Sequence, residues 1–192
     1  MARTGGVKTR KRILEKAEEL FSKDGFQGTS VNRIAQEAQV NKALIYYHFK
    51  DKNDIILSLF RNILEEFSSS DSPALVGLRS GTGLRDSPGA LRAEVSFLEK
   101  RRNILAVMLM ESLKTDDRDM SLFRCAELAM SSELRGAKTK SQLFHEFFTG
   151  FIPLIAFVAL KEKWCDFFQC DRDEALGYFV ESFIASHVDT HP

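Results

Sequence analysis

Residues 29–52 read TSVNRIAQEAQVNKALIYYHFKDK, and this stretch holds two short helical patterns. The first pattern can be capped by Thr29 or Ser30 and places apolar side chains at helical spacing. The second pattern starts at Asn41, a favourable cap residue, and runs to about His48. Because only two residues separate the patterns, we expect two helices joined by a tight turn.

A further helix is expected on each side of this stretch. The preceding helix has one apolar face and is stopped by Asp24-Gly25, where glycine can take a left-handed conformation. The following helix opens at Asp51, with Asp54 in the acidic position that favours a helix start. The first three helices, with the tight turn between the second and third, have the geometry of a helix-turn-helix. The apolar face of the first helix consists of Ile13, Leu14, Ala17, Leu20 and Phe21.

The third helix of such a motif enters the major groove, where its first residues meet base edges. In this chain Ile45 and, just beyond the helix, Phe49 have to face inward. The outward side chains are donors, acceptors and flat rings, which suit both phosphates and base edges. These side chains are Lys42, Tyr46, Tyr47 and His48. The small Ala43 allows close approach to DNA, and Leu44 can meet a thymine methyl group.

Two alternatives to DNA contact remain open within this helix. Tyr46 and Tyr47 could be core aromatics, but adjacent helical residues point about 100° apart, so both cannot be buried on one narrow face. His48 could be a structural residue, because cations near a helix C-terminus are favoured.

The stretch resembles the DNA-binding signature of TetR/AcrR-family transcriptional regulators. The resemblance covers residues 9 to about 60 and includes more than ten positions at fixed spacing without a gap. This chain departs from the family at Gln39 in the turn and at Ala43, where the family often has glycine. In a left-handed turn, Gln39 should cost about 1 kcal/mol relative to glycine.

The resemblance implies a set of DNA contacts and a second, helical domain. Thr29 and Lys52 would bind phosphates, and Arg33 on the exposed face of the second helix is a further candidate. The residues implied at the DNA are Asn41, Lys42, Ala43, Leu44, Tyr46, Tyr47 and His48.

The composition changes after the fourth helix. Residues 68–89 are rich in Ser, Gly and Asp, with two prolines, and are typical of a connector. We therefore expect an all-α protein with a helix-turn-helix domain at 1–67 and a ligand-binding and dimerisation domain at 68–192. The helical patterns of the second domain cover residues 90–100, 103–114, 119–134, 139–163 and 173–187.

The second domain is expected to join two copies of the chain. A single helix-turn-helix buries too little surface to select an operator, so such heads act as dimers on palindromic, paired half-sites. The helix at 139–163 is apolar almost all round and must be covered on two sides. A buried core helix in a monomer is the alternative. The expected interface residues are Phe151, Ile155, Leu176, Phe179, Val180 and Phe183.

The resemblance also implies a ligand cavity among the middle helices. A helix set rich in Phe and Met is also typical of a packed core, so this cavity stays a hypothesis. If it exists, its lining favours a small hydrophobic or aromatic ligand. The candidate lining residues are Phe97, Leu105, Met108, Leu109, Phe123, Leu128, Phe144 and Phe148.

Charge and composition limit the remaining possibilities. The formal net charge is zero, with three excess basic residues in 1–67 balanced by three excess acidic residues after it. The longest apolar stretch, residues 151–160, is too short to span a bilayer. We expect a cytoplasmic protein that does not contact a membrane. The basic side chains ahead of residue 13 could form a solvated tail or bind phosphates: Arg3, Lys8, Arg10, Lys11 and Arg12.

An enzyme is not expected. His145-Glu146 lacks the second histidine of a zinc-protease motif, and the chain has no phosphate-binding glycine loop. Neither a cofactor nor a metal is expected. Two alternatives remain, a DNA-bound interaction protein without an inducer and a metal- or thiol-responsive regulator. The second would use His187 with His191, or Cys165 with Cys170.

Overall fold

The computed structural model describes residues 2–69, 88–113, 121–133 and 139–189, and these residues contain helices and no strands. The expected all-α class is confirmed. The chain forms two compact units, one of residues 1–62 with 107–125 and the other of residues 63–106 with 126–192. The domain boundary expected at 67/68 stays a prediction, and most of the expected connector lies outside the described residues.

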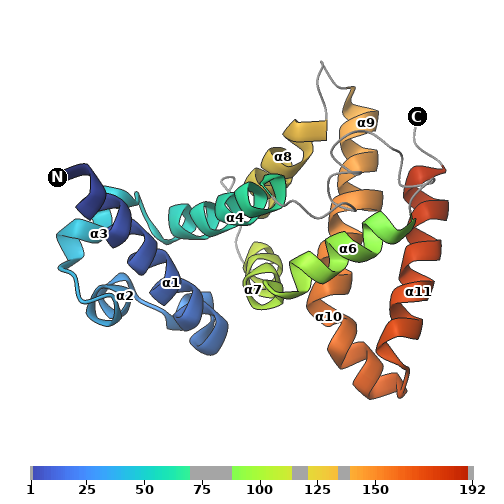
Figure 1. Cartoon of the computed structure of the whole chain (residues 1–192), viewed down its shortest axis with the longest axis horizontal. Helices are drawn as coiled ribbons and strands as arrows, with labels where there is room; N and C mark the ends of the chain where they lie inside the picture. The colour runs from blue at the N-terminus through green and yellow to red at the C-terminus, as the bar shows by residue number, and fades with distance from the viewer. Residues whose placement is uncertain (1, 70–87, 114–120, 134–138, 190–192) are drawn as a thin grey trace. The chain divides into compact units, whose positions relative to one another are not determined.

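The first unit contains the helix-turn-helix. Its helices are α1 (Ala2–Gly28), α2 (Val31–Glu37), α3 (Lys42–His48) and most of α4 (Lys52–Ser68). Helix α2 packs against both α1 and α3 (Figure 1). The five apolar residues expected on one face of α1 are all buried.

Local backbone chemistry sets the ends of these helices. The first helix is broken at Gly25, whose φ is 74°, as the Asp24-Gly25 pair predicts. The cap of α2 is Ser30, whose side chain accepts a hydrogen bond from the Arg33 backbone. Between α2 and α3, Gln39 takes the left-handed conformation with φ 51°. The turn therefore has the left-handed conformation that the sequence predicts, at a position where glycine would adopt it with less strain.

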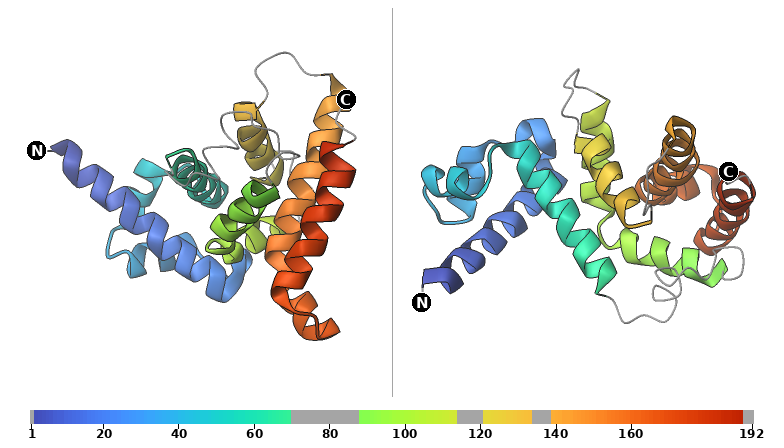
Figure 2. Two further views of the ribbon diagram at one scale, coloured as in Figure 1. Left: turned by 45° about the vertical axis from the view of Figure 1, so that its right-hand side comes forward. Right: turned by 90° about the horizontal axis from the view of Figure 1, so that it is seen from above.

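The second unit is a helical bundle. Helices α10 and α11 run side by side in opposite directions (Figure 2), and α6 packs against both. Their inner faces supply much of the unit's core, including Leu154, Val158 and Val180. The elements that lie wholly in this unit are α6 (Pro88–Glu99), α9 (Lys140–His145), the π-helical η1 (Glu146–Phe151), α10 (Ile152–Phe168), α11 (Arg172–Phe183) and the π-helical η2 (Ile184–Val188).

Three of the described helices contribute residues to both units. They are α4, α7 (Arg102–Ser112) and α8 (Ser121–Glu133). Segment 107–125 belongs to the same unit as the helix-turn-helix, although it lies far from it in sequence.

The helix expected at 139–163 continues to Phe168, where Gln169 ends it with φ 53°. Together α9, η1 and α10 form a 29-residue helix whose most apolar window has a mean hydropathy of 1.8. Length and composition alone would allow this helix to cross a membrane, a possibility that the short stretch 151–160 did not indicate. Within the part of the chain that the structure describes, 22% of that window is buried.

Candidate DNA-binding site

Helix α3 exposes two tyrosines to solvent, while its apolar side chain and that of the residue after it are buried. Tyr46 is 50% exposed and Tyr47 is 80% exposed, whereas Ile45 and Phe49 are buried. The inward and outward directions predicted for these residues are therefore those in the structure. Lys42 is exposed at the start of the helix, with its Nζ 5.8 Å from the centre of the Tyr46 ring.

The start of α3 is held by its cap. The Oδ1 atom of Asn41 accepts a hydrogen bond of 2.8 Å from the Leu44 backbone N–H. Asn41 and Ala43 are exposed, while Leu44 is half-buried. The Asn41 amide nitrogen takes no part in this bond and can still donate to another group.

Thr29 and Lys52, both expected at phosphates, also tie α1, α2 and α4 together. Thr29 is fully buried, and its hydroxyl donates to the Gly25 carbonyl at 2.8 Å. The Lys52 ammonium donates to the carbonyls of Phe26 at 2.8 Å and Thr29 at 3.0 Å, and lies 4.2 Å from the centre of the Phe26 ring. Burial lowers the pKa of Lys52, and Glu111 opposes that shift. Two of the three N–H groups of the Lys52 ammonium therefore already donate hydrogen bonds, and one remains for a phosphate.

Arg33 is exposed and pairs with Asp24 at 3.2 Å. The pair joins α2 to the C-terminal part of α1. An arginine in this position can reach a phosphate only by sharing or releasing Asp24.

Arg10 is a site residue that the sequence singled out only as part of a basic arm. Its guanidinium lies 5.1 Å from the centre of the Phe49 ring, directly after α3. Burial, and secondly the charge of Arg10, lower the pKa of His48. The His48 Nε2 atom is buried without a hydrogen-bond partner among the described residues. The lowered pKa favours the neutral form of His48 at neutral pH, whereas Arg10 brings a positive charge to this end of α3.

The residues expected to line a ligand cavity are divided between the two units. Leu105 and Met108 are buried in the core, and Phe97 packs against Phe67 with ring centres 5.6 Å apart. Others are exposed: Phe123, Phe144 and Phe148. The remaining two, Leu109 and Leu128, are half-buried. The cavity stays a prediction, because its expected residues do not share one environment.

The residues expected at the dimer interface have to be revised. All but Phe179 are buried within the protomer, where they face the core of the second unit. Side chains already covered by their own chain cannot supply the surface that a partner covers. The buried residues are Phe151, Ile155, Leu176, Val180 and Phe183.

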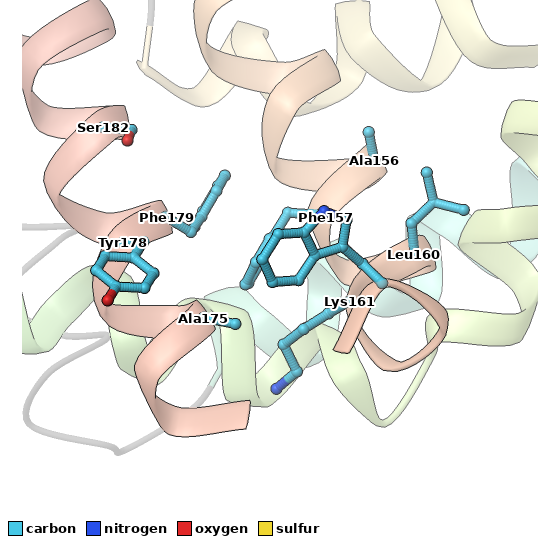
Figure 3. A pocket seen from close by; sticks show the side chains of 9 residues that line it. Ala156, Phe157, Leu160, Lys161, Ala175, Tyr178, Phe179 and Ser182 are labelled. Atoms are coloured by element: carbon cyan, nitrogen blue, oxygen red, sulfur yellow. The ribbon is translucent and has the colours of Figure 1, made fainter. Parts of the chain in front are cut away.

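The exposed apolar face of α10 and α11 is a different set of residues. Leu160, Trp164 and Tyr178 are each about half exposed, and the Phe157 and Phe179 rings stack 4.0 Å apart. They surround a hollow of about 380 Å³ between the two helices (Figure 3). Helical periodicity reveals an apolar helix but does not tell which of its sides faces the core. We call these five residues the α10–α11 face.

The sensing alternatives find little support. Cys165 is buried, and the pKa of the Cys170 thiol is raised by desolvation and by the nearby Glu174 carboxylate. A thiol with a raised pKa is a poor nucleophile at neutral pH. Within the described residues no group of three potential ligands could hold a metal ion. His191 lies outside the described residues.

Residues 13–59 match the model of the family described as bacterial regulatory proteins, tetR family. The HTH-type transcriptional repressor NicS of Pseudomonas putida is 32% identical over 91 residues, which are 47% of this chain and 40% of NicS. The chain covers less than half the length of the curated relatives that it matches.

Two solved structures show the fold of the whole chain. HlyIIR, a hemolysin II transcriptional regulator, aligns with a TM-score of 0.52 at 19% identity, over 92% of this chain and 97% of that one. FadR of Bacillus subtilis, solved with stearoyl-CoA, aligns with a TM-score of 0.50 at 18% identity, over 91% and 97%. The helix-turn-helix geometry and the family match show that residues 13–59 are similar to the DNA-binding part of the tetR family of bacterial regulatory proteins, and the two solved structures show the fold alone.

Proposed function

We propose that this protein is a dimeric transcriptional repressor that reads paired DNA half-sites with α3 and acts in the cytoplasm. The observation that carries the proposal is the polar and aromatic surface of α3, with two exposed tyrosines over buried Ile45 and Phe49. Exposed tyrosine rings and a lysine ammonium on a short helix that is anchored in the core suit contacts with base edges in the major groove. Repression is supported by the likeness to the repressor NicS.

The first test uses a DNA site selected from a random library by the full-length protein. Replacing Lys42 or Tyr47 by alanine should weaken binding to that site by about 5- to 150-fold, which corresponds to about 1–3 kcal/mol for a good base contact. Binding to unrelated DNA should change much less, because phosphate contacts supply it.

Lys163→Ala is the matched control, because Lys163 is exposed on α10 and outside the proposed reading surface. Gel-shift titrations at fixed salt measure all three variants. If Lys42→Ala and Tyr47→Ala both keep the affinity of the unaltered protein for the selected site, α3 is not the reading helix.

The α10–α11 face supports dimerisation by a second copy of the chain. It joins exposed aromatic side chains to a hollow lined almost wholly by apolar groups. In a twofold dimer the same surface serves both copies, so a projecting ring and a hollow on one face can complement each other. Two reading heads are also what paired half-sites require.

We also propose that a small hydrophobic ligand releases the protein from DNA. The likeness to FadR, which was solved with stearoyl-CoA, supports a fold that can hold an acyl chain. A panel of fatty-acyl and aromatic compounds, tested by thermal shift and then by DNA release, should yield a compound that raises the Tm and weakens operator binding. If no compound does both, a regulator without an inducer becomes the better description.

A further inference from the structure

The hollow between α10 and α11 contains a buried charged side chain in an apolar lining (Figure 3). Its volume of about 380 Å³ falls within the range of about 300–1,000 Å³ that is usual for small-molecule sites. Among the described residues that line it, Lys161 alone carries a charge. An apolar hollow with a few polar groups is the usual form of a small-molecule site.

Lys161 is only 8% exposed and is ion-paired with Glu99 of α6. From α10 its side chain runs toward Ala175 on α11 (Figure 3). A lysine ammonium has three N–H groups, and within the described residues Glu99 is the acceptor that pairs with them. The ammonium can therefore still donate at a place that water reaches poorly, where a donor without an acceptor is costly.

The other polar side chains of the lining are less suited to hold a ligand. The Tyr178 hydroxyl already donates to the Glu174 carboxylate on its own helix at 2.6 Å. Ser182 and Trp164 are exposed, so water competes for their polar groups. Lys161 is therefore the polar residue of the hollow from which a bound molecule gains most.

The ion pair also determines which charge a ligand can carry. Glu99 already neutralises Lys161, so an anionic ligand would bring a second carboxylate to one ammonium. Like charges repel strongly in apolar surroundings. A neutral ketone or ester oxygen accepts a hydrogen bond from the ammonium without adding a charge.

We propose that this hollow binds a neutral, apolar molecule with one carbonyl oxygen, and that Lys161 donates to that oxygen. The aromatic rings of the α10–α11 face contact the apolar part of the molecule. The hollow belongs to the face assigned above to dimerisation, so a molecule bound there alters the contact between the two copies. In this respect the inference rests on the proposed function, and it gives the releasing ligand a class and a place.

Binding can be followed at Trp164, which is the only tryptophan of the chain and lines the hollow. Three probes share one shape and differ in one group: adamantyl methyl ketone, isopropyladamantane and adamantanecarboxylate. In the full-length protein without DNA, the ketone should shift the Trp164 emission to shorter wavelength in a saturable manner, because the indole ring loses contact with water. The carboxylate should bind at least tenfold more weakly than the ketone.

Substitutions at the ion pair separate the roles of its two groups. Lys161→Met keeps the length of the side chain and removes the donor, so the ketone should bind at least tenfold more weakly. The affinity for isopropyladamantane, which needs no donor, should stay within twofold. Glu99→Gln leaves the ammonium without its counter-charge, so the order should reverse and the carboxylate should bind more tightly than the ketone.

Lys163→Met is the matched control, because Lys163 is exposed on the same helix and does not line the hollow. It should change none of the three affinities. If no probe shifts the emission, or if the carboxylate binds the unaltered protein more tightly than the ketone does, the proposal is overturned. Should circular dichroism show that Lys161→Met is unfolded, Glu99→Gln decides alone, and an unchanged order of ketone and carboxylate overturns the proposal.

A gel shift with the same ketone distinguishes this inference from the proposed function. If the ketone binds with the expected dependence on Lys161 and Glu99 but leaves operator binding unchanged, the site is supported and the proposed release by a ligand fails. If the ketone does not bind, this inference fails, and the proposed reading of DNA by α3 is unaffected.

Discussion

Gln39 lies in the turn between α2 and α3 with a φ of 51°, a conformation that favours glycine. The side chain is exposed, so nothing in the core compensates for the backbone strain. We expect Gln39→Gly to raise the free energy of unfolding by about 1 kcal/mol. Urea denaturation followed by circular dichroism measures the change.

Gln169 provides a comparison in the other unit. It is also exposed and has a φ of 53°, at the end of α10. Gln169→Gly should give a gain of similar size. Should Gln39→Gly lower the stability while Gln169→Gly raises it, the glutamine side chain itself must stabilise the turn.

At the scale of single residues, the sequence predicted best where periodicity applies. The buried position of Ile45 follows from helical spacing, and the same spacing predicts that Tyr46 and Tyr47 are not both buried. The bonds of Lys52 do not, because their acceptors, on Phe26 and Thr29, are 26 and 23 residues away in the chain. A local sequence pattern cannot predict a contact between residues that lie so far apart in the chain.

At the scale of elements, Lys52 joins the end of α1, the start of α2 and the start of α4 through one ammonium. Replacing it by methionine keeps the aliphatic length but leaves two backbone carbonyls without their donor. We expect Lys52→Met to lower the free energy of unfolding by about 2 kcal/mol, since hydrogen bonds from charged groups contribute about 1.5–3 kcal/mol.

Lys50→Met is the control, because Lys50 is exposed and precedes the same helix. It should change the stability by less than about 0.5 kcal/mol. Urea denaturation measures both variants. Equal stabilities for the two variants would mean that the Lys52 bonds contribute nothing beyond those that water makes.

Element boundaries show where the sequence was informative. The cap Asn41 is a side chain that bonds the first turn of its own helix, so local sequence predicts it. The helix that contains α10 was expected to end at about residue 163, yet it continues to Phe168. The apolar character of α10 was evident, but only packing against α6 and α11 decides which side is the core.

At the scale of the whole molecule, the chain combines α3, the proposed reading helix, in one unit with an exposed apolar face in the other. The return of residues 107–125 to the first unit could not be foreseen, since helical patterns describe each segment and not its neighbours in space. The all-α class and the helix-turn-helix could be foreseen, because both follow from local periodicity and turn chemistry.

In the proposed dimer, the α10–α11 face serves dimerisation and α3 serves DNA binding, and two substitutions can distinguish these roles. Trp164 is 45% exposed on the α10–α11 face, and Tyr47 is 80% exposed on α3, so glutamate at either position should leave the fold intact. Trp164→Glu places a charge beside the hollow, which two apolar faces cannot bury without a large cost. We expect it to sediment as a monomer and to lose operator binding by at least a hundredfold.

Tyr47→Glu should sediment as a dimer and lose operator binding all the same, because its charge repels phosphates without touching the α10–α11 face. Analytical ultracentrifugation and gel shifts on the same preparations give both readouts, and circular dichroism checks the helix content. If Trp164→Glu remains dimeric, the two copies meet elsewhere and another partner covers this face. If it becomes monomeric and still binds the operator at full affinity, a single reading head is sufficient, and the paired half-sites of the proposal are unnecessary.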